Sequence, residues 1–271
     1  MVSAAKIKEL REMTSAGMMD CKKALEATNG DMDEAVKWLR EKGIMKAAKK
    51  ESRIAAEGVC RVEVQGNLAT VFEVNSETDF VAKNQKFIDL VDTIAKAILA
   101  NKAKNDEEAL ETEYEGQKVK DIIVSAVATI GEKITLRRVS LVEKTDSQVF
   151  GAYTHMNGKI VVLTVLEGGT EEVAKDVCMH IAAMNPKYID KSYVDAEFLA
   201  SETEILRQET LNEGKPEKIV DKIVEGKVHK MLKSICLVDQ PYVKNEDITV
   251  GEYVHSNKAE IKQYIRLAVG E

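Results

Sequence analysis

The sequence predicts an α+β fold with an N-terminal three-helix domain, a core of two similar subdomains and an inserted antiparallel helical hairpin. Three observations predict it. The first fifty residues carry only helical patterns, one hairpin-turn-helix pattern occurs twice, and two long helical patterns interrupt the second copy. The predicted domains are 1–53, 54–144, 145–185 joined with 231–271, and the insertion 186–230.

The N-terminal domain is predicted to be a small bundle of the ubiquitin-associated type. Ser3 is expected to cap its first helix, and Ser15-Ala16-Gly17 to break it. Asp31 and Glu34 form a capping-box-like start to the third helix, which Gly43 is expected to end. The first helix carries Ile7, Leu10 and Met13, and the second is expected to turn Cys21, Ala24 and Leu25 inward.

Two features of this region allow alternative interpretations. Met18-Met19, at the start of the second helix, is either part of the core or an exposed and adaptable protein contact. The basic stretch 46–53 is either a solvated helical linker or a contact for an acidic partner. The residue types alone do not choose between these alternatives.

The repeated unit spans residues 58–97 and again 150–185. Gly66 corresponds to Gly158 and Val81 to Val173, in each case 92 residues later. Both copies read as two strands joined at a glycine turn, then a polar turn, then an amphipathic helix. In the first copy, one face of that helix is predicted to be buried through Phe87, Leu90, Val91, Ile94 and Ile98.

The polar turn of the first copy, residues 76–80, places Phe80 beside Asp79. A large apolar side chain there either packs under its own helix as a local staple or enters a pocket on a partner. The corresponding position in the second copy is Glu172, so the unit can form this turn without an aromatic ring. Both interpretations of Phe80 stay open at this stage.

The remaining elements follow from apolar periodicity. A helix near residues 122–130 ends at Gly131, and residues 134–144 read as a strand whose polar face holds Arg137 or Arg138. Helices 195–212 and 216–235 flank a Gly-Lys-Pro turn and are predicted to pair as an antiparallel hairpin. Because residues 260–269 return to a strand pattern, the hairpin reads as an insertion that could support self-association.

Composition excludes several classes of protein. The net charge of −7 argues against a nucleic-acid binder held by phosphate contacts alone. No apolar run approaches membrane-spanning length, and the N-terminus is not expected to be a secretory signal. Four isolated cysteines fit reduced thiols that fill the core, so a cytoplasmic location is expected.

Catalytic motifs are missing from the sequence. The four histidines are scattered, no metal-binding spacing is present, and His180 on an apolar helix face is expected to be a hydrogen-bonded core residue. The sequence therefore predicts no enzyme, no cofactor and no metal site. The alternatives are an RNA-binding module, a small hydrolase or transferase, and a scaffold protein.

Four motifs in order resemble those of the bacterial translation elongation factor Ts family over essentially the whole chain. They are Gly17-Met18-Met19-Asp20-Cys21-Lys22-Lys23-Ala24-Leu25, Thr78-Asp79-Phe80-Val81-Ala82-Lys83-Asn84, Ile130-Gly131-Glu132 with Arg137-Arg138-Val139, and Met179-His180-Ile181-Ala182-Ala183. The resemblance implies a guanine nucleotide exchange factor for the GTPase elongation factor Tu, acting in protein synthesis.

The resemblance also implies roles for individual residues. Phe80 would wedge into the GTPase near its magnesium site, supported by Thr78, Asp79 and Val81. Ile130 and Gly131 would pack beside this wedge. Met18 and Met19 would grip a helix on the other side of the nucleotide pocket, and His155 would touch a different domain of the partner.

One departure from the family pattern concerns the end of the sequence. Longer members continue past the last core strand into a C-terminal helical module, whereas this sequence ends at Gly270-Glu271. We expect any contact made by that module to be absent or to be replaced by an unidentified one.

Overall fold

The computed structural model describes residues 2–14 and 16–271. Two compact units make up the chain. The first contains Met1–Glu143, Thr154–Val161 and Leu267–Glu271, and the second contains Lys144–Tyr153 and Val162–Arg266. The four-part division expected from the sequence is finer than this one and stays a prediction.

The first unit begins with the expected three helices, α1 (Ala4–Thr14), α2 (Met18–Ala27) and α3 (Met32–Ala48). Asp31 caps α3, because its carboxylate accepts the amide of Glu34 at 2.9 Å. The buried residues of this bundle are Leu10, Cys21, Ala24, Leu25 and Ala35. The expected break at residues 15–17 falls partly on Ser15, which lies outside the described residues.

Gly43 does not end α3, contrary to the sequence-based expectation. The helix continues to Ala48, and Gly43 is buried inside it. A Cβ atom at Gly43 would lie 3.5 Å from the Cβ of Ala128 and 3.7 Å from a methyl group of Val124, both on α7 (Val119–Ile130). This glycine therefore marks a close approach of two helices, which is a second common reason for glycine in a helix.

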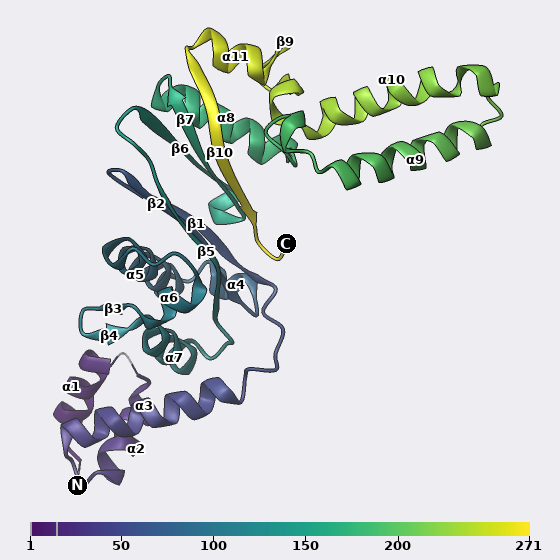
Figure 1. The fold of residues 1–271 in the computed structure, drawn as a ribbon. Helices are drawn as coiled ribbons and strands as arrows, with labels where there is room; N and C mark the ends of the chain where they lie inside the picture. The colour runs from purple at the N-terminus through teal and green to yellow at the C-terminus, as the bar shows by residue number, and fades with distance from the viewer. Residues whose placement is uncertain (1, 15) are drawn as a thin grey trace. The chain divides into compact units, whose positions relative to one another are not determined.

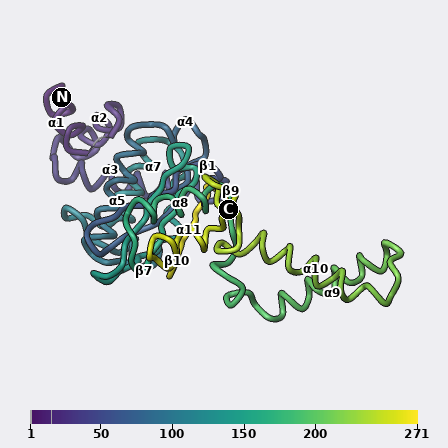
Figure 2. The backbone as a smooth tube through the Cα atoms, turned by 90° about the horizontal axis from the view of Figure 1, so that it is seen from above, coloured from purple at the N-terminus to yellow at the C-terminus, as the bar shows by residue number. Residues whose placement is uncertain are grey.

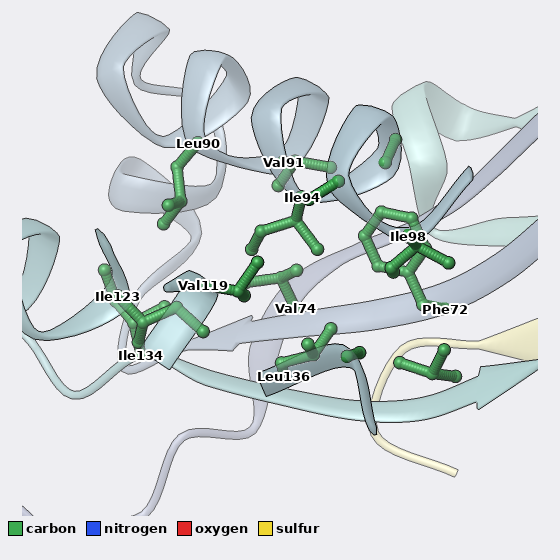
Figure 3. Close-up of a cluster of buried hydrophobic side chains, with 14 of the residues drawn as sticks. Phe72, Val74, Leu90, Val91, Ile94, Ile98, Val119, Ile123, Ile134 and Leu136 are labelled. Atoms are coloured by element: carbon green, nitrogen blue, oxygen red, sulfur yellow. The ribbon is translucent and has the colours of Figure 1, made fainter. Parts of the chain in front are cut away.

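A three-stranded antiparallel sheet forms the core of the first unit, in the order β1 (Glu57–Gln65), β2 (Leu68–Ser76) and β5 (Thr135–Glu143). α5 (Gln85–Asn101) and α7 cover one face of it (Figures 1 and 3). The apolar face predicted for 87–98 is confirmed, because all five of its residues are buried there. Smaller elements complete the unit: α4 (Asp79–Ala82), α6 (Asp106–Glu111), β3 (Glu113–Tyr114) and β4 (Gln117–Lys118).

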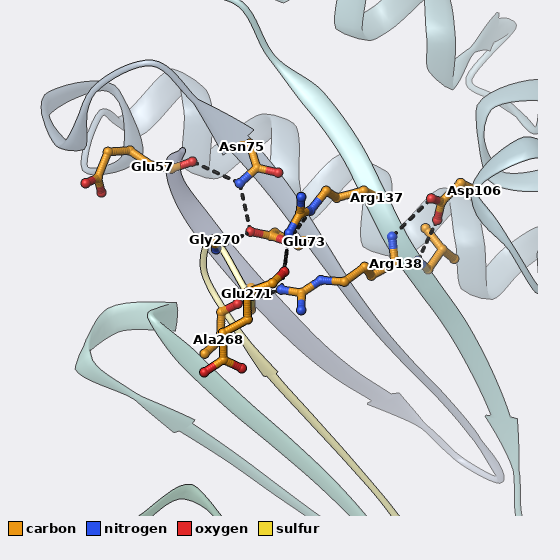
Figure 4. A network of polar contacts seen from close by, with 11 residues as sticks. Glu57, Glu73, Asn75, Asp106, Arg137, Arg138, Ala268, Gly270 and Glu271 are labelled. Carbon is orange, nitrogen blue, oxygen red and sulfur yellow. Dashed lines mark hydrogen bonds and ion pairs between the residues drawn. The ribbon is translucent and has the colours of Figure 1, made fainter. Parts of the chain in front are cut away.

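A β-bulge in β5 directs two consecutive arginines to one buried carboxylate (Figure 4). Neighbouring strand residues normally point to opposite faces, but Arg138 adopts a left-handed backbone with φ 59°. Arg137 and Arg138 therefore both reach the fully buried Glu73, at 2.6 and 2.7 Å. The sequence predicted that one of the two arginines would lie on the polar face of this strand. This prediction is corrected, because both arginines pair with Glu73.

The second unit carries the other copy of the repeat. Its sheet has the order β10 (Ala259–Ala268), β7 (Ile160–Gly168) and β6 (Gln148–His155), and α8 (Glu171–Met184) follows β7. β6 and β7 are joined by the short turn η1 (Met156–Gly158), which belongs to the first unit and is too short for a parallel crossover. Further elements are η3 (Leu237–Asp239), β8 (Pro241–Tyr242), β9 (Asn245–Thr249) and α11 (Val250–Ser256).

His180 on α8 is a hydrogen-bonded core residue, as predicted. Its Nδ1 accepts the amide of Val243 at 3.2 Å, so its Nε2 carries the proton and donates to Gln240 at 2.9 Å. Burial lowers the pKa of His180, and the Gln240 hydrogen bond opposes this shift. A neutral histidine with both nitrogens occupied is a structural group.

The predicted helical hairpin is confirmed as α9 (Ala196–Asn212) and α10 (Glu217–Ile235), preceded by η2 (Lys191–Tyr193). The two helices lie side by side in both views (Figures 1 and 2). At their base, Tyr188 forms a parallel bridge with Cys236, which closes the insertion on the second unit. Across the described residues, none of the helices has the length and apolar character needed to cross a membrane.

The helix starts confirm the repeat at the level of single hydrogen bonds. Thr78 and Thr170 occupy N-cap positions 92 residues apart, and each hydroxyl accepts the amide three residues later, from Val81 and Val173. After the cap, the copies differ. α8 is continuous, whereas the first copy makes the single turn α4 and restarts as α5 at Gln85. This interruption gives the first copy an additional turn.

Candidate partner-binding site

The additional turn, α4, holds Phe80 outward. Thr78 caps it, Val81 packs against the core of the first unit, and Ala82 is buried. Phe80, between these anchored neighbours, is 81% exposed. The sequence-based description of this segment as a plain polar turn is therefore corrected to one turn of helix, and the staple interpretation of Phe80 is wrong.

Glu132, directly after the C-cap of α7, fixes the segment that precedes Phe80. Its Oε2 accepts the amides of Glu77 and Thr78, both at 3.0 Å, and its Oε1 accepts the hydroxyl of Thr78 at 2.7 Å. Ionised carboxylates form strong hydrogen bonds with such donors. These three bonds determine the direction in which α4 begins.

Glu77 makes the reciprocal contact with the segment that contains Glu132. Its carboxylate accepts the amide of Lys133 at 2.7 Å and the guanidinium of Arg53 at 3.2 Å. The Lys133 amide, followed by Arg53, lowers the pKa of Glu77 below its usual value. We call this reciprocal pair of carboxylates, Glu77 and Glu132, the acidic latch.

Charged side chains surround the base of α4. Asp79 pairs with Lys83 at 2.7 Å, and this hydrogen bond lowers the pKa of Asp79 and raises that of Lys83. Lys159 further lowers the pKa of Asp79, and Glu57 further raises that of Lys83. Because Glu57 and Lys159 also pair with each other, the four residues form an alternating charge cluster.

Ile130 and Gly131 lie at the end of α7, immediately before Glu132. Gly131 is a left-handed C-cap with φ 93°, and its carbonyl accepts a hydrogen bond from Lys50. Ile130 packs partly buried against the core of the first unit. The latch thus connects the Ile130-Gly131 turn to residues 77–81, and these predicted site residues come together.

Three cations of the basic stretch 46–53 make contacts within the chain. Lys46 pairs with Asp20 at 2.9 Å, Lys50 donates to Gly131, and Arg53 contacts Glu77. Burial lowers the pKa of Lys50, and the nearby Arg53 adds to the shift. Lys50 and Arg53 therefore support the site from within the chain, whereas Lys46 pairs with α2.

Met18 and Met19 are separate from this turn. They begin α2, and they are 59% and 61% exposed, so the core interpretation of the pair is wrong. His155 is exposed at the end of β6, next to η1. Neither position belongs to the segments that form the acidic latch, residues 77–78 and 132–133.

Sequence reasoning missed Glu77, Glu132, Arg53 and Lys83 as supporting residues. Glu132 follows a helix-ending glycine and Glu77 precedes the Thr-Asp-Phe motif, but 55 residues separate them. Among the residues that the structure describes, His, Cys, Asp and Glu do not gather into a group that could hold a metal ion. The arrangement presents an apolar side chain on a rigid polar base, which suits binding to another protein.

A comparison with protein families gives one finding. The family model described as Elongation factor TS matches residues 77–271, which is more than two thirds of the chain. The match begins at Glu77, so it includes the whole of α4 and the acidic latch.

Proposed function

The chain belongs to the elongation factor Ts family of translation factors, and on that premise we propose that it is a guanine nucleotide exchange factor that uses Phe80 as a wedge in elongation factor Tu. Members of this family generally serve as the nucleotide exchange partner of that GTPase. The proposal concerns how this chain performs the exchange and which residues do so.

One observation carries the proposal. Phe80 is 81% exposed, although Val81 and Ala82 beside it are held against the core and the acidic latch fixes the preceding residues. Exposing an isolated phenylalanine on a rigid turn contributes little to folding. Insertion of Phe80 into an apolar pocket on a partner would bury the apolar surface that folding leaves exposed.

The mechanism follows from linkage between two ligands of the GTPase. If Phe80 displaces elements near the magnesium site, the phosphates of GDP lose part of their charge neutralisation and GDP dissociates faster. Exchange factor and GDP then weaken each other's affinity by the same factor, because coupling free energy is reciprocal. Binding of GTP reverses the process and releases the factor.

The other site residues receive supporting roles in this proposal. Asp79 holds α4 in its charge cluster, and Ile130 and Gly131 form the apolar edge beside the wedge. The exposed pair Met18-Met19 would contact a second helix of the GTPase, and His155 another of its domains. Methionine suits such contacts because its side chain is flexible and polarisable.

The hairpin supports a second proposal, self-association. Ile205, Leu211 and Ile219 on α9 and α10 are exposed apolar residues. A dimer through these helices would bury them. A scaffold acting only by such contacts would bind elongation factor Tu or itself without changing the rate of GDP release.

Stopped-flow release of labelled GDP from elongation factor Tu tests the proposed function. We expect the chain to accelerate release strongly at catalytic concentrations. In a parallel calorimetric experiment, the isolated chain should bind neither GDP nor Mg²⁺ tightly. Unchanged release with intact binding to the GTPase would favour the scaffold, and micromolar binding of GDP by the chain alone would contradict the exchange mechanism.

A further inference from the structure

The turn η1 presents a further exposed apolar side chain in the first unit. Met156 is 68% exposed, and its backbone has φ 49°. Asn157 and Gly158 follow with φ 54° and 90°, so three consecutive residues occupy the left-handed region. Glycine adopts this conformation freely and asparagine tolerates it, but methionine does so at a cost in conformational energy.

The fold does not require this arrangement, because the first copy of the repeat joins its strands more simply. There, Gln65 pairs directly with Leu68, and Gly66 has φ 60°. Val64, which corresponds to Met156 at the offset of 92 residues, is an ordinary strand residue paired with Ala69. The strained methionine is therefore a feature of the second hairpin alone.

The turn is also held firmly in place. η1 packs against β1, where a Cβ atom on Gly158 would lie 2.9 Å from the carbonyl oxygen of Cys60. The next residue, Lys159, pairs with Glu57 at the start of β1, and its carbonyl accepts the amide of Val269 at 3.0 Å. Met156 is thus an exposed side chain on a fixed base, as Phe80 is.

The two exposed side chains share one charge cluster. α4 and η1 both pack against β1. Lys159, three residues after Met156, pairs with Glu57 and acts electrostatically on Asp79, the neighbour of Phe80. The alternating charges of Glu57, Lys83, Asp79 and Lys159 therefore extend from the base of one turn to the base of the other.

We propose that Met156 is a second apolar anchor of the same surface as Phe80, and that it enters an apolar pocket on the GTPase bordered by both signs of charge. The inference rests on the proposed function, because it assigns Met156 the same partner. Continuity with the Phe80 turn identifies that partner, and the first copy of the repeat forms its hairpin without a strained residue at the position of Met156. The flexible thioether side chain can adapt to an irregular pocket.

Two substitutions separate binding from folding. Met156→Gly and Met156→Asn both remove the apolar side chain and replace it with a residue that accepts a left-handed backbone. We expect both variants to melt at or above the temperature of the unmodified protein. We also expect each to raise the Kd for the nucleotide-free GTPase by about 5- to 30-fold, as loss of an interface anchor does.

Three further variants complete the experiment. Met156→Leu should retain most of the affinity, and Val64→Ala, at the matched position of the first copy, should leave it unchanged. Phe80→Ala reports on the proposed function independently. If Phe80→Ala weakens binding but Met156→Gly and Met156→Asn bind normally, the inference about Met156 is overturned alone. A lower melting temperature in both Met156 variants would also overturn it, and an unmodified chain that does not bind would overturn the proposed function itself.

Discussion

Glu132 holds Thr78 through both its backbone amide, at 3.0 Å, and its hydroxyl, at 2.7 Å, although 54 residues separate them in the chain. Thr78 is in turn the cap of the helical turn that exposes Phe80. The direction of the proposed wedge is therefore set by a residue at the end of α7. The sequence motif around Phe80 supplies the wedge, and a distant carboxylate supplies its support.

Glu132→Gln is expected to reduce exchange without removing the wedge. Glutamine has one acceptor oxygen and cannot accept all three donors, so the variant leaves at least one polar group unsatisfied, a loss of about 1–3 kcal/mol. GDP release should slow accordingly. The same substitution in a Phe80→Ala background should have no further effect on release, because no ring is left to position.

The control for this variant is Glu143→Gln, which changes the same charge at an exposed position in β5. It should leave both release and melting unchanged. Fully additive effects of Glu132→Gln and Phe80→Ala would show that Glu132 acts on exchange by another route.

Gly43→Ala is expected to stabilise the protein. The new Cβ would lie 3.5 Å from that of Ala128, an ordinary contact distance, and alanine is favoured over glycine in a helix interior by about 0.5–1 kcal/mol. Gly43→Leu should destabilise it, because the larger side chain must displace α7. Chemical denaturation monitored through Trp38 on α3 measures both changes, and equal stability of the two variants would refute this account of Gly43.

The lowered pKa of Glu73 predicts that part of the stability of the first unit is lost in acid. Burial raises the pKa of Glu73, but the Gly270 amide, Arg137, Asn75 and Arg138 together outweigh it and hold the pKa below its ordinary value. A lowered pKa in the folded state stabilises the protein above the unfolded pKa of about 4.3, and this contribution is lost as pH falls further. Glu73→Gln should therefore be less stable at pH 7 and show a flatter decline of stability below pH 4.5.

Removing the helical hairpin should leave basal exchange intact. A deletion of residues 196–230, closed by a short glycine-serine linker, keeps the bridge between Tyr188 and Cys236 at the base. The wedge and the acidic latch belong to the other unit, so GDP release should continue at nearly the full rate. Sedimentation of the same variant tests self-association, and a folded deletion variant that no longer accelerates release would contradict the prediction.

The sequence predicted the elements well where apolar periodicity was strong. The inward face of α5 and both helices of the hairpin follow directly from spacing, and so does the repeat. Gly43 was misinterpreted because glycine signals either a helix end or a close approach, and only the partner helix decides between them.

The candidate site was only partly predictable. Phe80 stood out because its counterpart in the second copy is Glu172, but the extra helical turn that exposes it depends on a second cap, at Asn84. The acidic latch and the pairing of both Arg137 and Arg138 with Glu73 rest on tertiary hydrogen bonds and a left-handed bulge residue. Such contacts between distant segments leave no local pattern in a single sequence.

The most direct test of the central claim compares Phe80→Ala with Phe87→Ala in melting and in stopped-flow GDP release. Phe87 is fully buried in the core, so its truncation should cost about 3–5 kcal/mol of stability. Phe80→Ala should change stability by no more than about 0.5 kcal/mol yet lose about 2–4 kcal/mol of interaction with the GTPase, with GDP release slowed to match. A Phe80→Ala protein that melts far lower than the unmodified chain, while each folded molecule still accelerates GDP release normally, would contradict the account.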